Sequence, residues 1–290
     1  ARVRVAVDAR LPALLAHGLS SGLLVDPRDP LPAAAREALL SPGKRVRPGL
    51  VFLAGELFGA QEDRLLDPAC AVEMIHAASL ALDDLPSMDD ATTRRGRPAL
   101  HAVHGEDLAI LAAMTLVVRS FGVLAEAGLS TVRPAAALDL VSRLADASGL
   151  QGLSSGQALD LRTGEADASF DRLETIHARK TGALFVAAAE FGAVLGGARE
   201  RELAAVRSYA KNVGLAFQIV DDLLESEDPS RTGKHARRAP APTFVRHVGE
   251  EGARRLVAEL TLHAVEAVEP FGSRAALLRE FATLLRDRSA

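Results

Sequence analysis

Two clusters of acidic residues stand out as possible metal ligands. The first is Asp83-Asp84-Leu85-Pro86-Ser87-Met88-Asp89-Asp90, with four carboxylates in eight residues. It follows the mostly apolar stretch 71–82, and buried like charges repel each other unless something compensates them. Pro86 disfavours helix at Leu85, so we expect a bend there. That bend would bring Asp89 back toward Asp83, whereas a straight helix would place Asp89 on another face.

The second cluster is Gln218-Ile219-Val220-Asp221-Asp222-Leu223-Leu224-Glu225. Gln218, Asp221 and Glu225 are spaced to share one face of a helix. Magnesium usually takes one or two carboxylates and fills its other positions with water and phosphate oxygens. No His/Cys spacing favours zinc. One such cluster could equally be a solvated helix end, but two, each closing an apolar stretch, favour a magnesium site.

Basic groups accompany the acids and could bind an anion. They lie in Gly43–Pro48, which resembles a helix entry, in Arg94–Pro98, and at Lys180–Gly182, which we expect to open a helix and offer backbone N–H groups to phosphate. His76 precedes Asp83 by seven residues, close to the same helix face. Singly, these cations would be solvated surface and His76 a core histidine. Together with the acids they indicate a diphosphate pocket, with arginine as the bidentate partner.

Helices must position these residues. Apolar residues recur at three- and four-residue spacing through several stretches, and no stretch alternates strictly. Breakers separate the stretches at 41–43, 94–98, 149–156, 196–197 and 229–242. The pattern predicts an all-α fold of roughly ten helices or more, forming a single domain over residues 1–290. The predicted helices include Leu65–Leu85, Leu108–Ala127, Ala135–Ala147 and Leu203–Leu224.

The stretch Leu108–Leu124 is almost wholly apolar until Arg119. A helix that is apolar all round is a buried one, which favours a central core helix. A dimer interface is the other interpretation, and the two can be combined.

Composition excludes some classes of function. The 290 residues are 48% hydrophobic and carry a formal net charge of -4, which argues against a general nucleic-acid binder. Cys70 is the single cysteine, so a reducing, cytoplasmic location fits. No run of about 18 apolar residues lacks charges or breakers, so we expect no membrane span. Residues 1–10 lack the apolar core of a signal peptide.

The segment Met74–Asp90 resembles the first aspartate-rich motif of trans-prenyl diphosphate synthases. The resemblance extends over nearly the whole chain in the family's order, through Gly43–Pro48, Arg94–Pro98 with His101 and Gly105-Glu106, Gly156–Asp160, Lys180–Gly182 and Phe217–Asp222. It implies an isoprenoid-synthase helical bundle with a central active-site cavity, a homodimer, and three Mg2+ ions per site. The implied reaction is head-to-tail condensation of isopentenyl diphosphate with dimethylallyl, geranyl or farnesyl diphosphate.

The resemblance also implies a role for each matching residue. The implied magnesium ligands are Asp83, Asp84, Asp89, Asp221, Asp222 and Glu225. The implied isopentenyl diphosphate ligands are Lys44, Arg47, His76 and Arg95. The implied ligands of the allylic diphosphate are Arg94, Lys180, Thr181 and Gln218, with Lys234 near the leaving group. The residues expected to carry catalysis most directly are Asp83, Asp84, Arg94, Lys180 and Asp221.

Details of the motifs predict the product. Leu82 before Asp83-Asp84, where His is the alternative, and Ala91 after Met88-Asp89-Asp90 are most similar to geranylgeranyl diphosphate synthases of bacterial carotenoid pathways. In this family, bulky aromatics one turn before the first Asp close the chain pocket at fifteen carbons. Ala78 and Ser79 are small, so we expect a twenty-carbon product.

Two departures from the family pattern bear on activity. Glu225 stands where the second motif usually has Asp, and it keeps the charge. The loop 235–244 lacks the family's Asp and second Lys, and Pro242 stands near the place of that Lys. This loop motivates an alternative, a catalytically weak relative acting as a partner or regulatory subunit. A terpene cyclase would not need Lys44, Arg47 and His76, and a non-enzymatic helical scaffold would need no such charge clusters.

Overall fold

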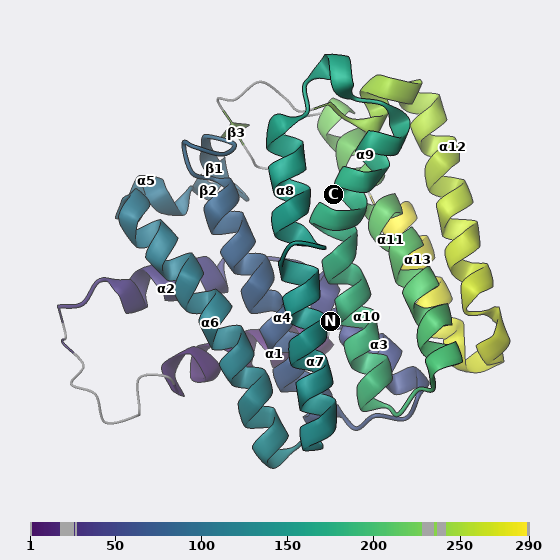
Figure 1. Cartoon of the computed structure of the whole chain (residues 1–290), viewed down its shortest axis with the longest axis horizontal. Coiled ribbons are helices and arrows are strands. Elements are labelled where there is room, and N and C mark those ends of the chain that lie inside the picture. Colours follow the sequence, from purple (N-terminus) through teal and green to yellow (C-terminus); the bar gives the residue numbers. More distant parts are fainter. Residues whose placement is uncertain (1, 18–25, 27, 228–234, 237–241, 289–290) are drawn as a thin grey trace. The chain divides into compact units, whose positions relative to one another are not determined.

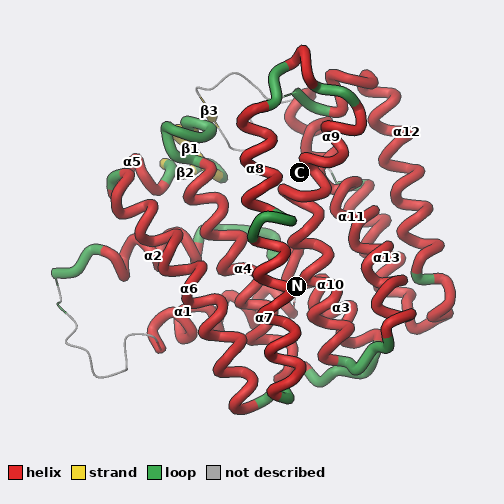
Figure 2. Tube along the Cα trace, in the orientation of Figure 1, coloured by secondary structure: helices red, strands yellow, loops and turns green. Residues whose placement is uncertain are grey.

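The computed structural model describes residues 2–17, 26, 28–227, 235–236 and 242–288 (Figure 1). Helices dominate these residues, with a few short strands (Figure 2), which confirms the all-α prediction. The α-helices are α1 (Arg2–His17), α2 (Leu31–Leu40), α3 (Val46–Leu57), α4 (Glu62–Asp83), α5 (Leu100–His104), α6 (Glu106–Ser130), α7 (Pro134–Ser148), α8 (Leu153–Arg162), α9 (Phe170–His177), α10 (Ala183–Leu195), α11 (Glu200–Glu227), α12 (Phe244–Ala267) and α13 (Ala276–Arg286). The strands are β1 (Ala91–Arg94), β2 (Arg97–Pro98) and β3 (His235–Ala236).

The chain divides into two compact units. Unit 1 comprises Ala1–Phe52, Glu62–Val141 and Gly233–Ala239, and unit 2 comprises Leu53–Gln61, Ser142–Thr232 and Pro240–Ala290. Unit 1 therefore contains the first acidic cluster, and unit 2 contains the second. A single domain over residues 1–290 stays a prediction.

Unit 1 is built on α4 and α6, which pack along each other, with α1, α2 and α5 beside them. Small residues on both helices permit close packing: α4 buries Ala71, Ala77 and Ala78, and α6 buries Ala109 and Ala113. Large apolar side chains fill the remaining space, since protein interiors are close-packed. Fully buried examples are Leu65, Met74, Leu116 and Leu124.

The predicted core helix 108–124 is only partly buried. One face of α6 packs against the other helices of unit 1, but its apolar residues Ile110, Leu111, Met114 and Val118 are exposed. By length and composition, α4 and α6 could each cross a membrane; 67% of the apolar window of α4 and 39% of that of α6 are buried inside the protein. A core helix has the same composition, so this criterion alone does not distinguish a span from a packed helix.

Unit 2 is organised around α11, which packs against α10 and α12. α10 is nearly all apolar and buries Leu184, Phe185 and Phe191, as expected for a central helix. The fully buried Tyr209 on α11 donates its hydroxyl hydrogen bond to the backbone carbonyl of Leu278, 2.6 Å away. A buried phenol needs such a partner, and the bond ties α11 to α13.

The four helices predicted from periodicity are present as α4, α6, α7 and α11, with ends shifted by one to three residues. One local prediction is wrong. Lys180–Gly182 does not open a helix, because residues 178–182 form a π-helical turn that joins α9 directly to α10. Gly182 keeps helical dihedral angles there, so nothing in the sequence breaks the helix.

Candidate active site

The acidic turn of unit 1 folds back as its sequence predicts. α4 ends at Asp83, and the backbone N–H of Asp89 donates to the carbonyl of Asp83 at 2.9 Å. The N–H of Ala91 similarly bonds to the carbonyl of Asp84 at 3.1 Å. The turn therefore returns Asp89 to the end of the helix that carries Asp83, which confirms the bend expected from Pro86.

Arg94 interacts with the carboxylates of this turn. Its Nε donates to both carboxylate oxygens of the buried Asp84, at 2.9 and 3.2 Å, and its Nη2 also bonds to Asp84. Hydrogen bonding to Asp84 and the nearby charges of Asp83 and Asp89 outweigh burial and raise the pKa of Arg94. Three carboxylates thus lie within electrostatic reach of one guanidinium.

A tight hairpin positions Arg94 and Arg95. β1 and β2 pair antiparallel, with Arg94 opposite Arg97. The two residues between them, Arg95 and Gly96, have φ angles of 52° and 73°. Positive φ at both central positions suits the two-residue turns that match the twist of paired strands. The sequence predicts only a breaker here, because strands of two to four residues are too short to show a period.

The charges of four arginines act on His76, which lies on α4. Burial first, and then the charges of Arg47, Arg95, Arg94 and Arg45, lower the pKa of His76 well below its ordinary value. The Nη2 atom of Arg95 lies 3.5 Å from His76 Nε2. The imidazole is therefore neutral at neutral pH. Guanidiniums close to one another can bind a diphosphate as bidentate partners.

In unit 2, Lys180 and Thr181 lie on the π-helical turn. Lys180 Nζ donates to Asp160 Oδ2 on α8 at 2.6 Å. The two segments approach closely because Gly156 has no side chain: a Cβ there would lie 2.2 Å from the backbone N of Lys180. π-Helical turns are rare and often mark functional positions.

A hydrogen-bonded chain links this turn to the second acidic cluster. Thr181 Oγ1 donates to Gln218 Oε1 at 2.8 Å, and Gln218 Nε2 donates to Asp222 Oδ1 at 3.0 Å. Asp222 is buried, and its Oδ2 has no hydrogen-bond partner. Burial raises the pKa of Asp222 to about 7, and the charges of Asp221 and Glu225 add to this, while hydrogen bonds from Gln218 and from the backbone of Phe244 oppose it.

Asp221 on the same helix is paired with a residue far along the chain. Arg288 Nη2 donates to Asp221 Oδ1 at 2.6 Å and to the carbonyl of Phe217 at 2.7 Å. The guanidinium carbon lies 3.8 Å from the centre of the Phe217 ring, a cation–π arrangement. Glu225 is exposed one turn further on.

These residues fit a magnesium ion that shares its coordination with substrate. Among the residues that the structure describes, no three His, Cys, Asp or Glu side chains converge enough to hold a metal by themselves. Magnesium needs only one or two carboxylates when phosphate and water supply the other ligands. The donors available are all oxygens, and the buried Oδ2 of Asp222 lacks a partner that a cation would provide. The donor chemistry is that of a hard divalent cation.

The structure brings most predicted residues together within their own units. Asp83, Asp84, Asp89, Arg47, His76, Arg94 and Arg95 lie in the unit 1 site, with Lys44 exposed beside them, and Lys180, Thr181, Gln218, Asp221 and Asp222 lie in the unit 2 site. Lys234 and much of the altered loop 235–244 lie outside the described residues. The sequence missed two partners, Asp160 and Arg288. Asp160 belongs to a motif already noticed, whereas nothing marks Arg288.

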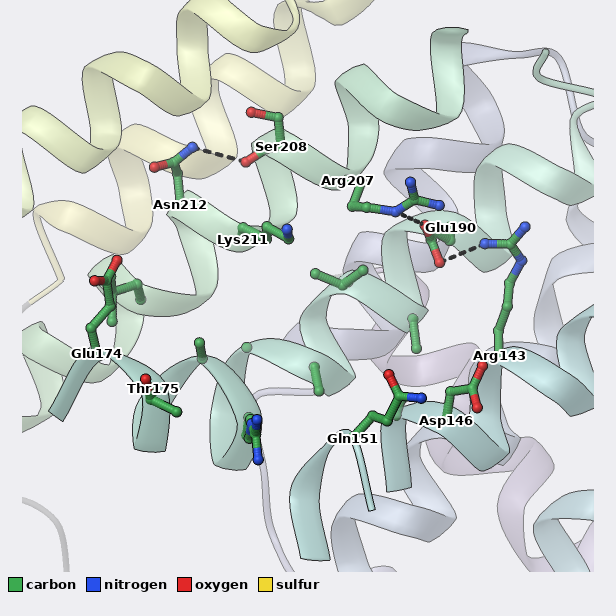
Figure 3. A pocket seen from close by; sticks show the side chains of 18 of the residues that line it. Arg143, Asp146, Gln151, Glu174, Thr175, Glu190, Arg207, Ser208, Lys211 and Asn212 are labelled. Carbon is green, nitrogen blue, oxygen red and sulfur yellow. Dashed lines mark hydrogen bonds and ion pairs between the residues drawn. The ribbon is translucent and has the colours of Figure 1, made fainter. Parts of the chain in front are cut away.

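A cavity of about 800 Å³ lies elsewhere in unit 2 (Figure 3). Ala178, Arg179 and Gly182 of the π-helical turn line it, but Lys180 and Thr181 do not. Its polar feature is the buried Glu190, which accepts bonds from Arg207 at 2.6 Å and from Arg143 at 2.7 Å. The charges of Glu190, Arg207 and Arg143 therefore satisfy one another on one side of this cavity.

An all-helical fold with aspartate-rich turns and a cluster of arginines defines the class of enzymes that handle prenyl diphosphates. The sequence matches the polyprenyl synthetase family over residues 29–238, and the chain therefore belongs to that family and is a prenyltransferase.

Curated relatives and solved structures agree with this assignment. A chloroplastic geranylgeranyl pyrophosphate synthase 12 of Arabidopsis thaliana is 42% identical over 258 residues, which cover 86% of this chain and 72% of the relative. The apo structure of an FPP/GFPP synthase from Zymomonas mobilis has a TM-score of 0.83 at 34% identity, covering 97% of this chain and 96% of the other. A geranyltransferase from Helicobacter pylori, complexed with magnesium and isoprenyl diphosphate, has a TM-score of 0.82 at 28% identity, with coverage of 96% and 93%.

Proposed function

We propose that the protein condenses isopentenyl diphosphate head-to-tail with an allylic diphosphate in a magnesium-dependent reaction that releases pyrophosphate. The observation that carries this proposal is the arginine cluster around His76 beside the carboxylates gathered by Arg94. The relatives named as geranylgeranyl pyrophosphate synthases and the magnesium complex of the Helicobacter pylori enzyme support it.

The residues divide between the two substrates. Lys44, Arg47, His76 and Arg95 bind isopentenyl diphosphate, and Arg94, Lys180, Thr181 and Gln218 bind the allylic diphosphate, with Lys234 near the leaving group. The lowered pKa of His76 favours a neutral imidazole, which binds by hydrogen bonding and not by charge. Asp160 holds Lys180 in place. Asp83, Asp84, Asp89, Asp221, Asp222 and Glu225 are the magnesium ligands, three ions per site.

The chemistry begins when the C–O bond of the allylic diphosphate breaks, giving an allylic carbocation and pyrophosphate. Bound magnesium supplies positive charge that stabilises the leaving group. Arg94 and Lys180 add fixed positive charge for the same purpose. The alkene of isopentenyl diphosphate attacks the cation, forming the new C–C bond, and a proton is then lost to the pyrophosphate. The apolar surroundings of both sites exclude water that would quench the cation.

Geranylgeranyl diphosphate, with twenty carbons, is the proposed product. Ala78 and Ser79 lie buried on α4, one turn before Asp83, and both are small. The geranylgeranyl pyrophosphate synthases at about 40% identity support this length. The test is Ala78→Phe, with products sized by chromatography. A shift to fifteen carbons or fewer supports the proposal, and an unchanged length contradicts it.

The proposed assembly is a homodimer formed through α6. Its exposed apolar residues Ile110, Leu111, Met114 and Val118 form a stripe at helical spacing, and such a stripe is typical of a protein interface. Val118→Glu should give a monomer by light scattering. We also propose a cytoplasmic location, in keeping with the single buried Cys70, and supply of carotenoid precursors.

The decisive experiment uses the purified protein. It is incubated with labelled isopentenyl diphosphate and each of the five-, ten- and fifteen-carbon primers, with magnesium or with a chelator. Magnesium-dependent pyrophosphate release and prenyl products support the proposal. Absence of turnover with all three primers would instead favour the alternative of a partner or regulatory subunit, which the altered loop 235–244 suggests.

A further inference from the structure

Arg45 lies between two residues expected to bind substrate, yet it is turned away from solvent. Lys44 is exposed, whereas Arg45 retains only 6% of its surface. Arginine is rarely buried unless it is paired, so its burial has a local purpose. Nothing in the proposed division of substrate ligands uses it.

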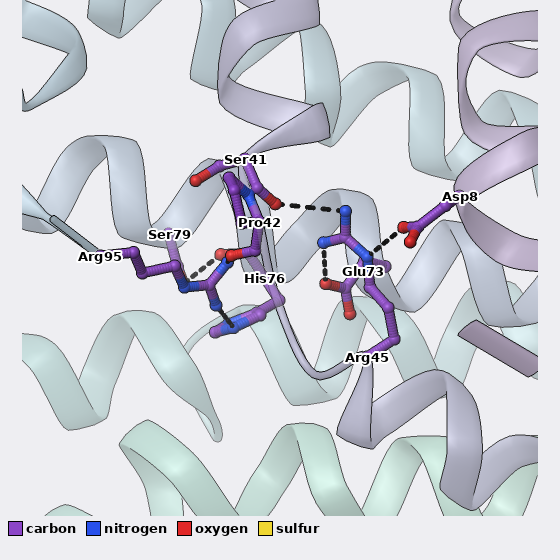
Figure 4. A network of polar contacts seen from close by, with 8 residues as sticks. All are labelled: Asp8, Ser41, Pro42, Arg45, Glu73, His76, Ser79 and Arg95. Atoms are coloured by element: carbon purple, nitrogen blue, oxygen red, sulfur yellow. Dashed lines mark hydrogen bonds and ion pairs between the residues drawn. The ribbon is translucent and has the colours of Figure 1, made fainter. Parts of the chain in front are cut away.

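The Arg45 guanidinium binds three separate parts of unit 1 (Figure 4). Nε donates to Asp8 Oδ1 on α1 at 2.7 Å, and Nη1 donates to the buried Glu73 Oε1 on α4 at 2.7 Å. Nη2 donates to the carbonyl of Ser41, at the end of α2, at 3.2 Å. The planar guanidinium can satisfy several acceptors at once, which lysine cannot. Arg45 therefore fastens the segment 41–45 to two helices.

The backbone of this segment needs such fastening. Arg45 has a φ of 51°, in the left-handed region that is unfavourable for a residue with a side chain. Such a conformation persists only when surrounding contacts enforce it. Here it turns the chain between the exposed Lys44 and the start of α3 at Val46, which is followed by Arg47.

The same segment also holds Arg95. Arg95 Nη1 donates to the carbonyl of Pro42 at 2.6 Å, as Figure 4 shows. Gly43 leaves room for both guanidiniums: a Cβ there would lie 2.8 Å from Arg95 Nη1 and 3.3 Å from Arg45 Nη1. A shift of the segment would therefore move Arg95 as well as Lys44 and Arg47.

Arg45 differs from the other arginines near His76 in how its charge is compensated. Its guanidinium is compensated by Glu73 and Asp8, so it has little positive charge to offer a ligand. Its hydrogen bonds to these acids and to Ser41 leave it few free donors. Its role is mechanical, since it holds the loop that carries the substrate-binding cations.

The geometry points to Arg45 as a positioning residue for the isopentenyl diphosphate subsite, acting through the segment 41–47 and without touching substrate. This inference rests on the proposed function. The arrangement that supports it is a buried Arg45–Glu73 pair, closed by Asp8 and Ser41, beneath the loop that presents Lys44 and Arg47.

The test measures steady-state kinetics and equilibrium binding of isopentenyl diphosphate by calorimetry. We expect Arg45→Met to raise the KM and Kd for isopentenyl diphosphate roughly tenfold, while the KM for the allylic substrate and kcat change less than about twofold. Because Arg45→Met leaves Glu73 buried without its partner, Asp8→Asn is measured alongside. It removes one anchor and keeps the buried pair, and a rise of about threefold is expected. Arg45→Lys should recover part of the loss.

The matched control is Arg10→Met. Arg10 also joins α1 to α4, through two bonds to Asp67 at 2.7 and 2.8 Å, but it does not touch the segment 41–47. It should leave both KM values unchanged. In a double-mutant cycle, Arg45→Met and Glu73→Gln together should raise the KM for isopentenyl diphosphate no more than Arg45→Met alone, because the pair acts as a unit.

Two results would overturn the inference. If Asp8→Asn and Glu73→Gln leave binding unchanged or tighter while Arg45→Met weakens it, Arg45 contacts the diphosphate directly. If all variants lower the unfolding temperature but keep the wild-type KM values, Arg45 serves stability alone. Failure of the proposed function has a different signature, because the unmodified protein would then neither bind isopentenyl diphosphate nor turn it over.

Discussion

The two acidic motifs hold their charges in different ways. In unit 1, Asp84 is paired with Arg94, ten residues along the chain and fixed by a hairpin, and four arginines lie around His76. In unit 2, Asp222 is buried with one oxygen unpartnered, and Asp221 pairs with Arg288, which lies 67 residues away. The charge of Asp84 in unit 1 is therefore compensated by a nearby arginine, whereas the carboxyl of Asp222 in unit 2 is buried with an oxygen that has no hydrogen-bond partner.

This difference indicates which of the two sites depends more on a bound cation. A carboxylate that is already paired with an arginine gains less from a bound cation. A buried carboxylate with a raised pKa becomes fully ionised and satisfied only when a positive charge reaches it. We therefore expect magnesium to change the energetics of unit 2 more than those of unit 1, and the following experiments test that contrast.

The largest effect is expected from Asp84→Ala. The substitution removes a proposed magnesium ligand and leaves Arg94 without its main partner, so kcat/KM should fall about 10³-fold or more. Stability should fall by about 3 kcal/mol, since a buried ion pair is broken. Rates of product formation and urea unfolding measure the two effects. Asp63→Asn, on the exposed first turn of the same helix, is the control; a loss within tenfold for Asp84→Ala would remove this residue from the metal site.

Asp222→Asn should behave in the opposite way for stability. The folded-state pKa is about 7 and the unfolded value is about 4, so wild type is destabilised as pH rises through this range. With a chelator at pH 8.5, the variant should be about 2–4 kcal/mol more stable than wild type, and at pH 4 the gain should vanish. Urea unfolding at the two pH values measures this. Activity with magnesium should fall. A variant less stable than wild type at pH 8.5 would refute a strained carboxyl.

The buried His177 of unit 2 should make the stability of the protein depend on pH. Burial lowers the pKa of His177 to about 4, and Asp160 and Lys180 have smaller, opposing effects. Its unfolded pKa is about 6.5, so the folded state is fully stable above that pH and loses about 3 kcal/mol as pH falls to 4. Unfolding of wild type and His177→Leu across this range measures the loss.

The pKa of His76 in unit 1 should respond to a bound anion more strongly than that of His177. Its pKa is lowered by burial and by arginines that a bound anion would neutralise. Added pyrophosphate should therefore raise the pKa of His76 more than that of His177, on which Lys180 has only a small effect beside burial. NMR of the imidazole protons follows both, and an unchanged pKa of His76 would show that the arginines do not form an anion site.

The smallest effect concerns Arg288. Its guanidinium occupies an oxygen of Asp221 that is proposed to bind magnesium, so Arg288→Ala should tighten magnesium binding roughly three- to tenfold in calorimetry. Arg286→Ala is the control, because Arg286 pairs with the exposed Asp287. Weaker binding in Arg288→Ala would mean that Arg288 supports the metal site and does not compete with it.

The sequence predicted the helices well because most of them bury one face. Ala135–Ala147 shows the period clearly, and Pro86 correctly predicted the bend after Asp83. It could not predict the hairpin at Arg94–Arg97, whose strands are too short for a period. It also gave the wrong structure for Lys180–Gly182, since residue types favour an α-helix and a π-turn equally.

The site residues were recognised by type and motif, but their partners depend on tertiary structure. Asp84 and Arg94 are close in sequence, so their pairing could be guessed. Asp221 and Arg288 are not, and no pattern in residues 286–290 announces a contact with α11. Arg45 belongs to the basic stretch Gly43–Pro48, and only its contacts with Asp8 and Glu73 show that it faces inward.

The π-helical turn at Ala178–Gly182 carries one residue more than an α-helix of the same length would hold. Deleting a single residue from it would let the backbone relax into regular α-helix, and would rotate every later side chain of the helix by about 100°. The backbone of such a shortened helix would be unstrained, yet Thr181 would no longer form its hydrogen bond with Gln218. Evolution and engineering of this segment are therefore constrained in length more strictly than in composition.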